Sequence, residues 1–304
     1  MGVPKYSAIA HHAMHTWSTV NWPDVRFLML SFYDDSGFTA GFDASGKEAD
    51  QPVVIVAGFV SSAKDWISFS EQWQARLALD GFSYFHMVEF AHSAEHFAKL
   101  KGNEGKRREL LGDLMEIIKS HAYRKFALAV EVPVFVQGLD EEFRKQFYLT
   151  AYSLLGRVVA AEAYSWHREL KLSAPLKLVF ETGDDQEELS KRMQGDGYPA
   201  PDFRPKTDRT SKLGIFESGY LPLQAADFLA YEYFLKMKRT VEGLDDSRVW
   251  AWSEFARIIG EPGVFTEQSL IGAQELFSAI RVAQESVRTI SRAAESGQKE
   301  RDET

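Results

Sequence analysis

Four acidic side chains in this sequence occupy positions where a carboxylate could do chemistry. Asp34 and Asp35 directly follow one apolar run, and Glu181 follows a second. Asp227 lies inside an apolar segment, where an isolated acid is costly unless it has a partner. Gln224 comes three residues before Asp227 and shares its face of the expected helix. Carboxylates that converge from strand ends and a helix face form an oxygen-rich site suited to Mg²⁺ or Mn²⁺.

Two such ions about 4 Å apart can activate water and stabilise the leaving oxygen of a phosphodiester. Each acid also has a structural interpretation. Asp34 and Asp35 fit a hairpin turn, Glu181 fits a loop that caps a helix starting at Asp184, and Asp227 fits a hydrogen-bonded structural aspartate. No single position decides between the two interpretations, so both stay open.

Two sequence motifs resemble those of a known family. Residues 32–37, Phe-Tyr-Asp-Asp-Ser-Gly, resemble the opening motif of domain-of-unknown-function family 3800, hydrophobic-Asp-Glu-Ser-Gly. Residues 220–231 contain Leu-Gln-Ala-Ala-Asp-Phe-Leu-Ala and resemble its closing motif, Leu-Gln-x-Ala-Asp-x-x-Ala. Two shorter segments lie between these motifs. Phe85-His86 falls where the family has Phe-His, and residues 178–183, Leu-Val-Phe-Glu-Thr-Gly, fall where it has hydrophobic-Asp-x-Gly. The resemblance covers about residues 27–237.

The resemblance implies a ribonuclease H-like α/β fold in a mostly bacterial family with no firmly assigned activity. The order of expected elements independently predicts a mixed sheet, with an antiparallel meander and then parallel strands, and flanking helices. The expected C-terminal helical extension, from Val249 onward, lies outside the resemblance. Carried over position by position, the resemblance makes Asp34, Glu181 and Asp227 the metal-binding and catalytic triad. It makes His86 a further catalytic residue and Gln224 an accessory residue beside the cofactor.

Two positions depart from the family pattern. Asp35, also expected beside the cofactor, replaces the usual glutamate and shortens that carboxylate by one methylene. Glu181 replaces the more usual aspartate and lengthens another. Both substitutions keep the negative charge, so binding of Mg²⁺ or Mn²⁺ remains the expectation, with altered reach at two ligands.

The expected elements that position these residues alternate between strands and helices. Nearly continuous apolar runs indicate buried strands, and apolar residues at spacings of three and four indicate helices. The predicted strands are Phe27–Tyr33, Phe38–Phe42, Val53–Val60, Tyr84–Val88, Phe126–Val132, Leu176–Phe180 and Leu213–Phe216. The predicted helices are Ala63–Asp80, Arg107–Ser120, Leu139–Leu170 with a kink at Gly156, Asp184–Met193, Pro222 to about Lys238, Val249–Ile259, and Thr266 to about Arg292.

This order predicts three regions. Residues 1–25 form an irregular N-terminal arm, and residues 26–240 form the ribonuclease H-like core with a helical insertion. Residues 241–304 form the C-terminal helical extension, whose charged end is expected to fray. Pairing of these last helices would give a homodimer.

Composition narrows the classes of function. The chain has 304 residues, no cysteine, and 44 acids against 35 bases, which excludes disulfides, thiolate metal sites and cysteine nucleophiles. A negative balance disfavours general attraction to nucleic acid. Two basic segments, Lys99–Arg108 and Arg204–Lys212, would supply local contacts to the phosphates of a nucleic acid or nucleotide substrate, or are solvated loop charge. No apolar run approaches the ~20 residues of a membrane span, so we expect a cytoplasmic protein without a membrane partner.

Three hypotheses follow. The first is a divalent-metal-dependent phosphodiesterase or nuclease that uses the acidic cluster. The second is a non-catalytic module that binds nucleic acid or protein in a defence or mobile-element system, with vestigial carboxylates. The third is a zinc hydrolase, because residues 92–96, His-Ser-Ala-Glu-His, match a zinc-peptidase signature that would place His92 and His96 one helical turn apart.

Overall fold

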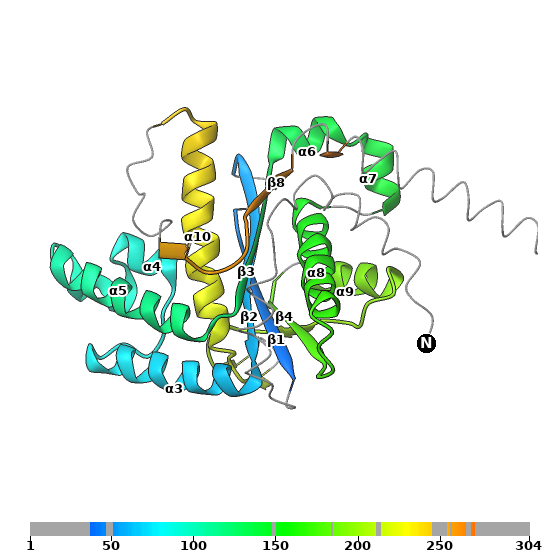
Figure 1. Cartoon of the computed structure of the whole chain (residues 1–304). Coiled ribbons are helices and arrows are strands. Elements are labelled where there is room, and N and C mark those ends of the chain that lie inside the picture. Colours follow the sequence, from blue (N-terminus) through cyan, green and yellow to red (C-terminus); the bar gives the residue numbers. More distant parts are fainter. Residues whose placement is uncertain are drawn as a thin grey trace, which may run out of the picture.

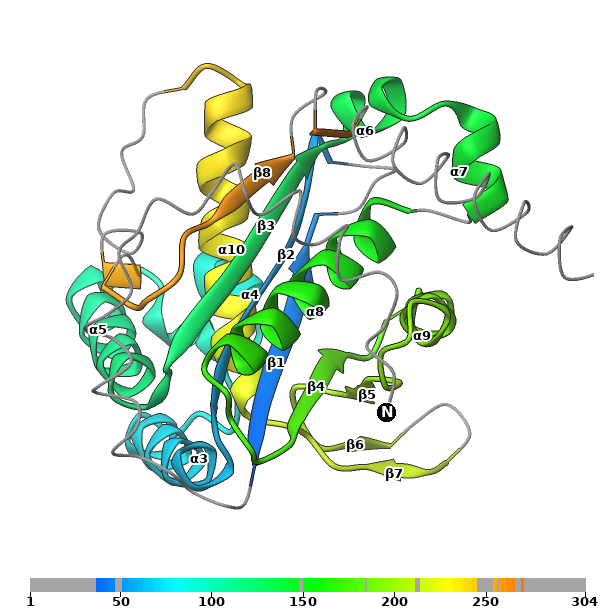
Figure 2. The same cartoon turned by 45° about the vertical axis from the view of Figure 1, so that its right-hand side comes forward.

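A computed structural model describes residues 37–46, 51–147, 150–183, 185–210, 214–244, 254–255, 257–265 and 269–270. Its described part has three layers, with a mixed β-sheet between two layers of helices (Figure 1). Figure 2 shows α8 lying across one face of the sheet while α10 lies behind it on the other. The predicted α/β class, with an antiparallel and a parallel part to its sheet, is therefore confirmed.

The sheet has six strands in the order β5-β4-β1-β2-β3-β8. Antiparallel pairing joins β1 to β2 and β2 to β3, and parallel pairing joins β1 to β4, β4 to β5 and β3 to β8. Two further short strands, β6 and β7, pair with each other in a separate antiparallel ribbon. The strands are β1 Phe38–Ser45, β2 Val53–Ser62, β3 Arg124–Glu131, β4 Leu176–Glu181, β5 Asp202–Arg204, β6 Arg209–Thr210, β7 Phe216–Glu217 and β8 Gly263–Phe265.

Strand β2 shows why the sheet lies between two helical layers. All of its residues are buried, as expected for a strand covered on both faces. Its alternate side chains enter opposite cores, with Ile55 on the side of one layer and Val56 on the side of the other. The first layer contains α3 Ala63–Leu79, α4 Met87–His92, the 3-10 helix η1 Glu95–Leu100, α5 Glu104–His121 and α10 Pro222–Val241. The second contains α6 Val132–Gly138, α7 Glu141–Phe147, α8 Ala151–Glu169 and α9 Gln186–Gly195.

Local signals explain where the principal helices begin. Ser62 caps α3 by accepting a hydrogen bond from the backbone of Asp65. Thr150 and Ser153 form a capping box at the start of α8. Pro222 occupies the first turn of α10, where its missing N–H costs nothing.

Two predicted elements are wrong. Residues 84–86 are not a strand, and α4 begins immediately afterwards at Met87. The predicted helix 139–170 is not one helix kinked at Gly156, because α7 ends at Phe147 and α8 begins at Ala151. Gly156 continues α8 without a break, and a Cβ placed there would lie 3.0 Å from the side chain of Leu189 in α9. Close helix packing therefore accounts for this glycine.

The predicted C-terminal extension is not purely helical. Gly263–Phe265 form β8 at the edge of the main sheet, and Phe255 and Ile258 are buried in the core beside α10. Several predicted features lie outside the described residues: the arm 1–25, the strand 27–33, Asp34 and Asp35, and most of the helix 266–292. The expected dimer through the C-terminal helices stays a prediction. None of the described helices is long and apolar enough to span a membrane.

Candidate functional site

The site is built first from the carboxyl ends of two neighbouring strands. Parallel pairing of β1 with β4 sets Phe42 opposite Phe180. The next residues, Asp43 and Glu181, therefore come to the same edge of the sheet. The side chain of Asp43 is 2% exposed and that of Glu181 is 31% exposed, so one carboxylate is fixed in the interior and the other reaches solvent.

Helix α10 and the loop after β5 complete a four-residue cluster. Nζ of Lys206 lies 2.8 Å from Oδ2 of Asp43, 3.1 Å from Oε2 of Glu181 and 2.9 Å from Oδ1 of Asp227. The other carboxylate oxygen of Asp227, Oδ2, accepts a hydrogen bond of 2.6 Å from the backbone of Met87. We call Asp43, Glu181, Lys206 and Asp227 the carboxylate cluster. Three carboxylates from three separate elements thus meet at one ammonium group.

Gln224 connects the three segments that surround the cluster. Its Oε1 accepts hydrogen bonds from Nε1 of Trp73 at 2.8 Å and from the backbone of Phe85 at 2.9 Å. Its Nε2 donates to the backbone carbonyl of Lys206 at 3.0 Å. The side chain is fully buried, so these bonds satisfy an amide that would otherwise be costly to bury. Gln224 therefore fixes α3, the segment before α4 and the Lys206 loop to α10.

Burial and mutual attraction set the charges within the cluster. Burial raises the pKa of Asp43 to about 7, although the ammonium of Lys206 opposes this rise. Burial also raises the pKa of Asp227, again against the effect of Lys206. Burial alone would lower the pKa of Lys206, but attraction from the three carboxylates raises it well above its usual value. The lysine is therefore charged, whereas Asp43 and Asp227 lose their protons less readily than exposed aspartates do.

His86 lies beside this cluster. It directly precedes α4, and its Nδ1 lies 3.0 Å from Oε1 of Glu89. A positive charge on His86 would lower the pKa of Asp227, which places the imidazole within electrostatic reach of the cluster. The side chain of His86 is 35% exposed, so it remains open to solvent.

The structure brings together three of the residues predicted from the sequence, Glu181, Gln224 and Asp227, and places His86 next to them. Asp34 and Asp35 lie outside the described residues. Sequence reasoning missed Asp43 and Lys206. The signal for Asp43 was present, since residues 43–46 read Asp-Ala-Ser-Gly after an apolar strand. They match the opening motif at its aspartate and at the closing Ser-Gly, as residues 34–37 do.

The cluster has the donor chemistry of a divalent-metal site, but Lys206 occupies its centre. Among the described residues, no group of three or more histidine, cysteine or acidic side chains is arranged as it stands to hold a metal ion. The buried Oδ2 of Asp43 forms an ion pair with Lys206 but has no hydrogen bond of good geometry. A buried carboxylate oxygen without such a bond, facing two other carboxylates, fits a cation that coordinates more closely than an ammonium does.

The zinc interpretation is wrong for the geometry of residues 92–96. Helix α4 ends at His92, and Ser93 adopts a left-handed conformation with φ of 48°. His92 and His96 are therefore not one turn apart on a common helix. The ring of His96 packs against those of Tyr84 and Phe97, with centroid separations of 4.1 and 4.2 Å.

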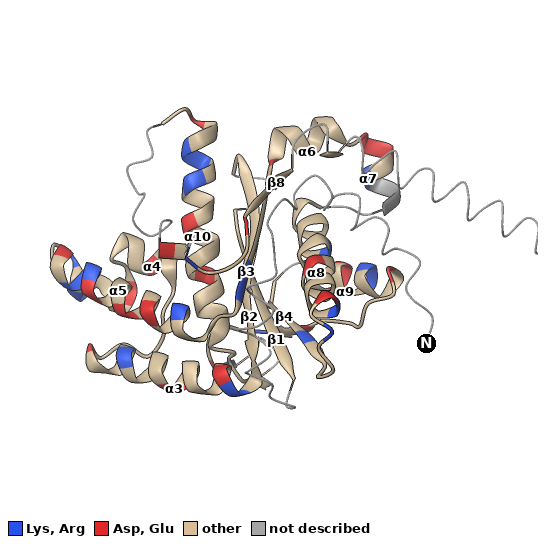
Figure 3. Ribbon diagram, in the orientation of Figure 1, with Lys and Arg blue, Asp and Glu red and all other residues tan. Residues whose placement is uncertain are grey.

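Some bases of the two basic segments are engaged by the protein itself. Lys99 donates hydrogen bonds to the carbonyls of Asp80 and Gly81, and Arg107 donates to Phe90 and Ser93. Lys206 lies inside the carboxylate cluster. Figure 3 shows residues of both charge signs along α5. Lys101, Lys106 and Arg108 of the first segment are exposed.

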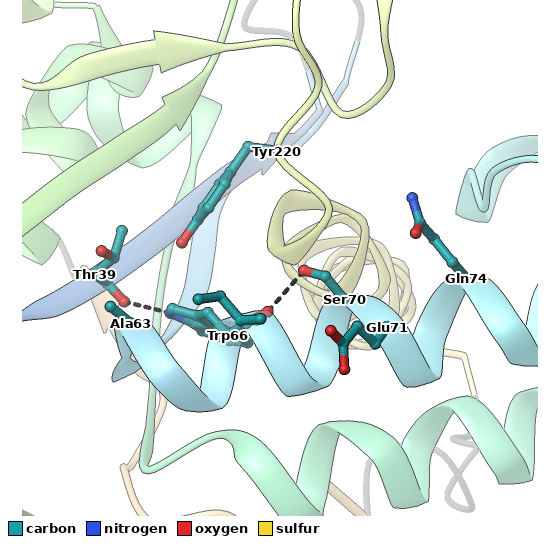
Figure 4. A pocket seen from close by; sticks show the side chains of 8 residues that line it. Thr39, Ala63, Trp66, Ser70, Glu71, Gln74 and Tyr220 are labelled. Atoms are coloured by element: carbon teal, nitrogen blue, oxygen red, sulfur yellow. Dashed lines mark hydrogen bonds between the residues drawn. The ribbon is translucent and has the colours of Figure 1, made fainter. Parts of the chain in front are cut away.

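A surface pocket of about 350 Å³ is lined by residues of β1, α3 and the segment before α10 (Figure 4). Its lining includes Thr39, Trp66, Ile67 and Tyr220, and Nε1 of Trp66 donates to the carbonyl of Thr39 at 2.7 Å. Thr39 is four residues before Asp43 on β1, and no residue of the carboxylate cluster lines the pocket.

Comparison of this chain with models of protein families, with curated proteins and with solved structures finds no match in any of the three.

Proposed function

We propose that this protein is a divalent-metal-dependent phosphodiesterase of the nuclease class, and that Asp43, Glu181 and Asp227 bind the metal. The observation that carries the proposal is the convergence of these three carboxylates on a single Nζ, at distances between 2.8 and 3.1 Å. Mg²⁺ or Mn²⁺ is the cation that such an all-oxygen donor set favours.

The arrangement of the strands supports a ribonuclease H-like scaffold for this site. The antiparallel meander β1-β2-β3 is followed by the parallel neighbours β4 and β5, as expected of that fold. The resemblance to domain-of-unknown-function family 3800 also supports it, with the opening motif reassigned to residues 43–46. Asp43 then takes the place that the sequence gives to Asp34.

Lys206 is consistent with this proposal because a buried carboxylate cluster needs a cation. Carboxylates held this close repel one another, and their charged forms are costly to bury without a partner. The ammonium of Lys206 supplies that charge while no divalent ion is bound. Asp43, Glu181 and Asp227 would hold the ion, and Glu181, which is partly exposed, has the greatest freedom to adjust to it.

A bound divalent ion would polarise a phosphoryl oxygen and lower the pKa of a water molecule. The chain's own residues supply the rest. The hydrogen bond from Met87 holds the carboxylate of Asp227 in place, and Gln224 holds the backbone of Lys206 against α10. With a metal bound to the carboxylates, the ammonium of Lys206 would be available as positive charge for a phosphate. We assign proton exchange at the cluster to His86, whose charge acts on Asp227.

The test combines calorimetry with hydrolysis of bis(p-nitrophenyl) phosphate in the presence of Mn²⁺. Asp43→Asn and Asp227→Asn should each abolish Mn²⁺ binding and lower turnover at least about 100-fold, since each removes a charged ligand. Asp202→Asn is the matched control, because Asp202 is exposed on β5 and should leave both quantities unchanged. Full activity in both cluster variants would end the proposal.

A second candidate is the non-catalytic binding module. The observation that favours it is the absence, among the described residues, of a group already arranged to hold a metal. In that case the Lys206 ion pairs are the permanent state of the cluster. Failure of the wild-type protein to bind Mn²⁺ in the same calorimetric experiment would select this alternative.

A further inference from the structure

We propose that Glu89 is a positioning residue that orients His86 as the proton acceptor of the carboxylate cluster, an inference that rests on the phosphodiesterase function proposed above. In this arrangement Glu89 holds Nδ1 of the imidazole, and Nε2 accepts the proton of the attacking water.

The backbone on both sides of His86 is fixed to the cluster by side chains of α10. The backbone N–H of Phe85 donates to Gln224 at 2.9 Å, and that of Met87 donates to Asp227 at 2.6 Å. Both acceptors are buried. The position of the His86 backbone is therefore set by two of the site's own side chains, one of them a proposed metal ligand.

The side chain of His86 is held separately. Its Nδ1 lies 3.0 Å from Oε1 of Glu89, three residues later on α4, and the hydroxyl of Tyr84 donates to Oε2 of Glu89 at 2.8 Å. Both oxygens of Glu89 are thus engaged. Burial alone would raise the pKa of Glu89, but the hydrogen bonds from His86 and Tyr84 lower it below its usual value. Glu89 is therefore a charged acceptor.

A charged acceptor at Nδ1 determines what the other ring nitrogen can do. It favours the tautomer with hydrogen on Nδ1, which leaves Nε2 with a free lone pair. Carboxylates that hold catalytic or metal-bound imidazoles fix the tautomer and the orientation of the ring in the same way. His86 is one-third exposed, so solvent reaches the ring. Burial in the core therefore does not explain why a carboxylate fixes the orientation of this side chain.

Hydrolysis of the phosphodiester transfers one proton from water to His86. The oxygen of water bonds to phosphorus while one of its O–H bonds breaks, and Nε2 of His86 takes that proton. The ester P–O bond breaks, and its electron pair leaves with the alcohol oxygen. His86 then returns the proton to solvent. Glu89 remains ionised throughout and forms no covalent bond.

The test compares Glu89→Gln with the control variant Glu95→Gln. Glu95 is an exposed acid six residues after Glu89. Glu89→Gln keeps the shape of the side chain and removes its charge. We expect kcat for bis(p-nitrophenyl) phosphate to fall about 10- to 100-fold, with KM and Mn²⁺ affinity changed less than about twofold, and Glu95→Gln to match the wild type. Tyr84→Phe should show the same pattern with a smaller loss.

Nitrogen-15 NMR of the histidine rings in the metal-free protein provides the readout independent of activity. The wild type should show the Nδ1–H tautomer for His86, and Glu89→Gln should shift it toward a mixture. An unchanged tautomer, an unchanged kcat, or a parallel loss of Mn²⁺ affinity would overturn the positioning role. Dinucleotides have a leaving group that must be protonated by an acid. If Glu89→Gln lowered kcat for dinucleotides but not for bis(p-nitrophenyl) phosphate, His86 would be a proton donor, and its role as acceptor of the proton of water would be overturned. Absence of hydrolysis by the wild type would instead refute the phosphodiesterase function, while the NMR result still decides the Glu89–His86 pairing.

Discussion

Replacing Lys206 with methionine tests how the carboxylate cluster is held together. Lys206→Met keeps an unbranched stem of similar length and removes the ammonium that contacts all three carboxylates. The side chains of Asp43 and Asp227 are 2% and 4% exposed, so their charges gain little from water. Leaving a buried charge without its partner costs about 3–5 kcal/mol. Glu181, at 31% exposed, adds about 1 kcal/mol or less.

We therefore expect Lys206→Met to lose about 3–5 kcal/mol of unfolding free energy at pH 8 in EDTA. The loss should shrink toward pH 5, because protonation of Asp43 and Asp227 removes the charges that have lost their counter-ion. Adding Mn²⁺ in place of EDTA should restore the unfolding free energy of Lys206→Met. A ligand at 100 times its Kd adds about 2.7 kcal/mol, and the gain should exceed that of the wild type because no ammonium competes for the oxygens.

The assay is urea unfolding, followed by tryptophan fluorescence, at pH 8 and pH 5 with EDTA or Mn²⁺. Lys177→Met is the matched control, since Lys177 is an exposed lysine of β4 and its loss should cost less than about 0.5 kcal/mol. A cost below about 1 kcal/mol for Lys206→Met would refute the view that Lys206 neutralises a buried cluster. A variant that gains no stability from Mn²⁺ would refute the replacement of the ammonium by metal.

Three further predictions concern single residues of the site. Burial raises the pKa of Asp43 from 3.8 to about 7, so between these two pH values the folded protein keeps a proton that the unfolded chain releases. The contribution of Asp43 to the free energy of unfolding therefore falls as pH rises through that window. Asp43→Asn should remove this part of the pH dependence in urea unfolding at pH 4.5 to 7.5. For the same reason, Mn²⁺ binding at pH 6.5 should release a proton from Asp43, seen as a dependence of the calorimetric enthalpy on buffer ionisation, and no such dependence would count against Asp43 as a ligand. Gln224→Leu should cost about 2–4 kcal/mol in thermal or urea unfolding, because Trp73 and Phe85 each lose a buried acceptor, and a cost under about 0.5 kcal/mol would exclude Gln224 as the connection between these segments.

The sequence allowed much of the core to be predicted. Runs such as 53–60 and 176–180 are apolar enough to identify strands buried on both faces, and both became strands of the central sheet. Glu181 was recognisable because an acid that ends such a strand comes to the edge of the sheet. Asp227 and Gln224 were recognisable because they share a helix face within an apolar segment.

The remainder depended on tertiary contacts. Lys206 lies in a loop whose charge looks solvated in the sequence, and contacts with distant segments, such as the hydrogen bond from Gln224 to its carbonyl, hold it beside α10. Asp43 was obscured because Asp34 and Asp35 offer a similar Ser-Gly motif nine residues earlier. Residues 84–88 looked like a strand, but the N–H groups of Phe85 and Met87 bond to side chains of α10 rather than to a neighbouring strand.

Calorimetric titration of Mn²⁺ into the wild type, Asp43→Asn and Asp34→Asn tests the central claim most directly. The carboxylate cluster predicts saturable binding by the wild type and by Asp34→Asn, and loss of binding in Asp43→Asn with the protein still folded. No binding by the wild type, or binding that survives in Asp43→Asn and disappears in Asp34→Asn, would contradict it.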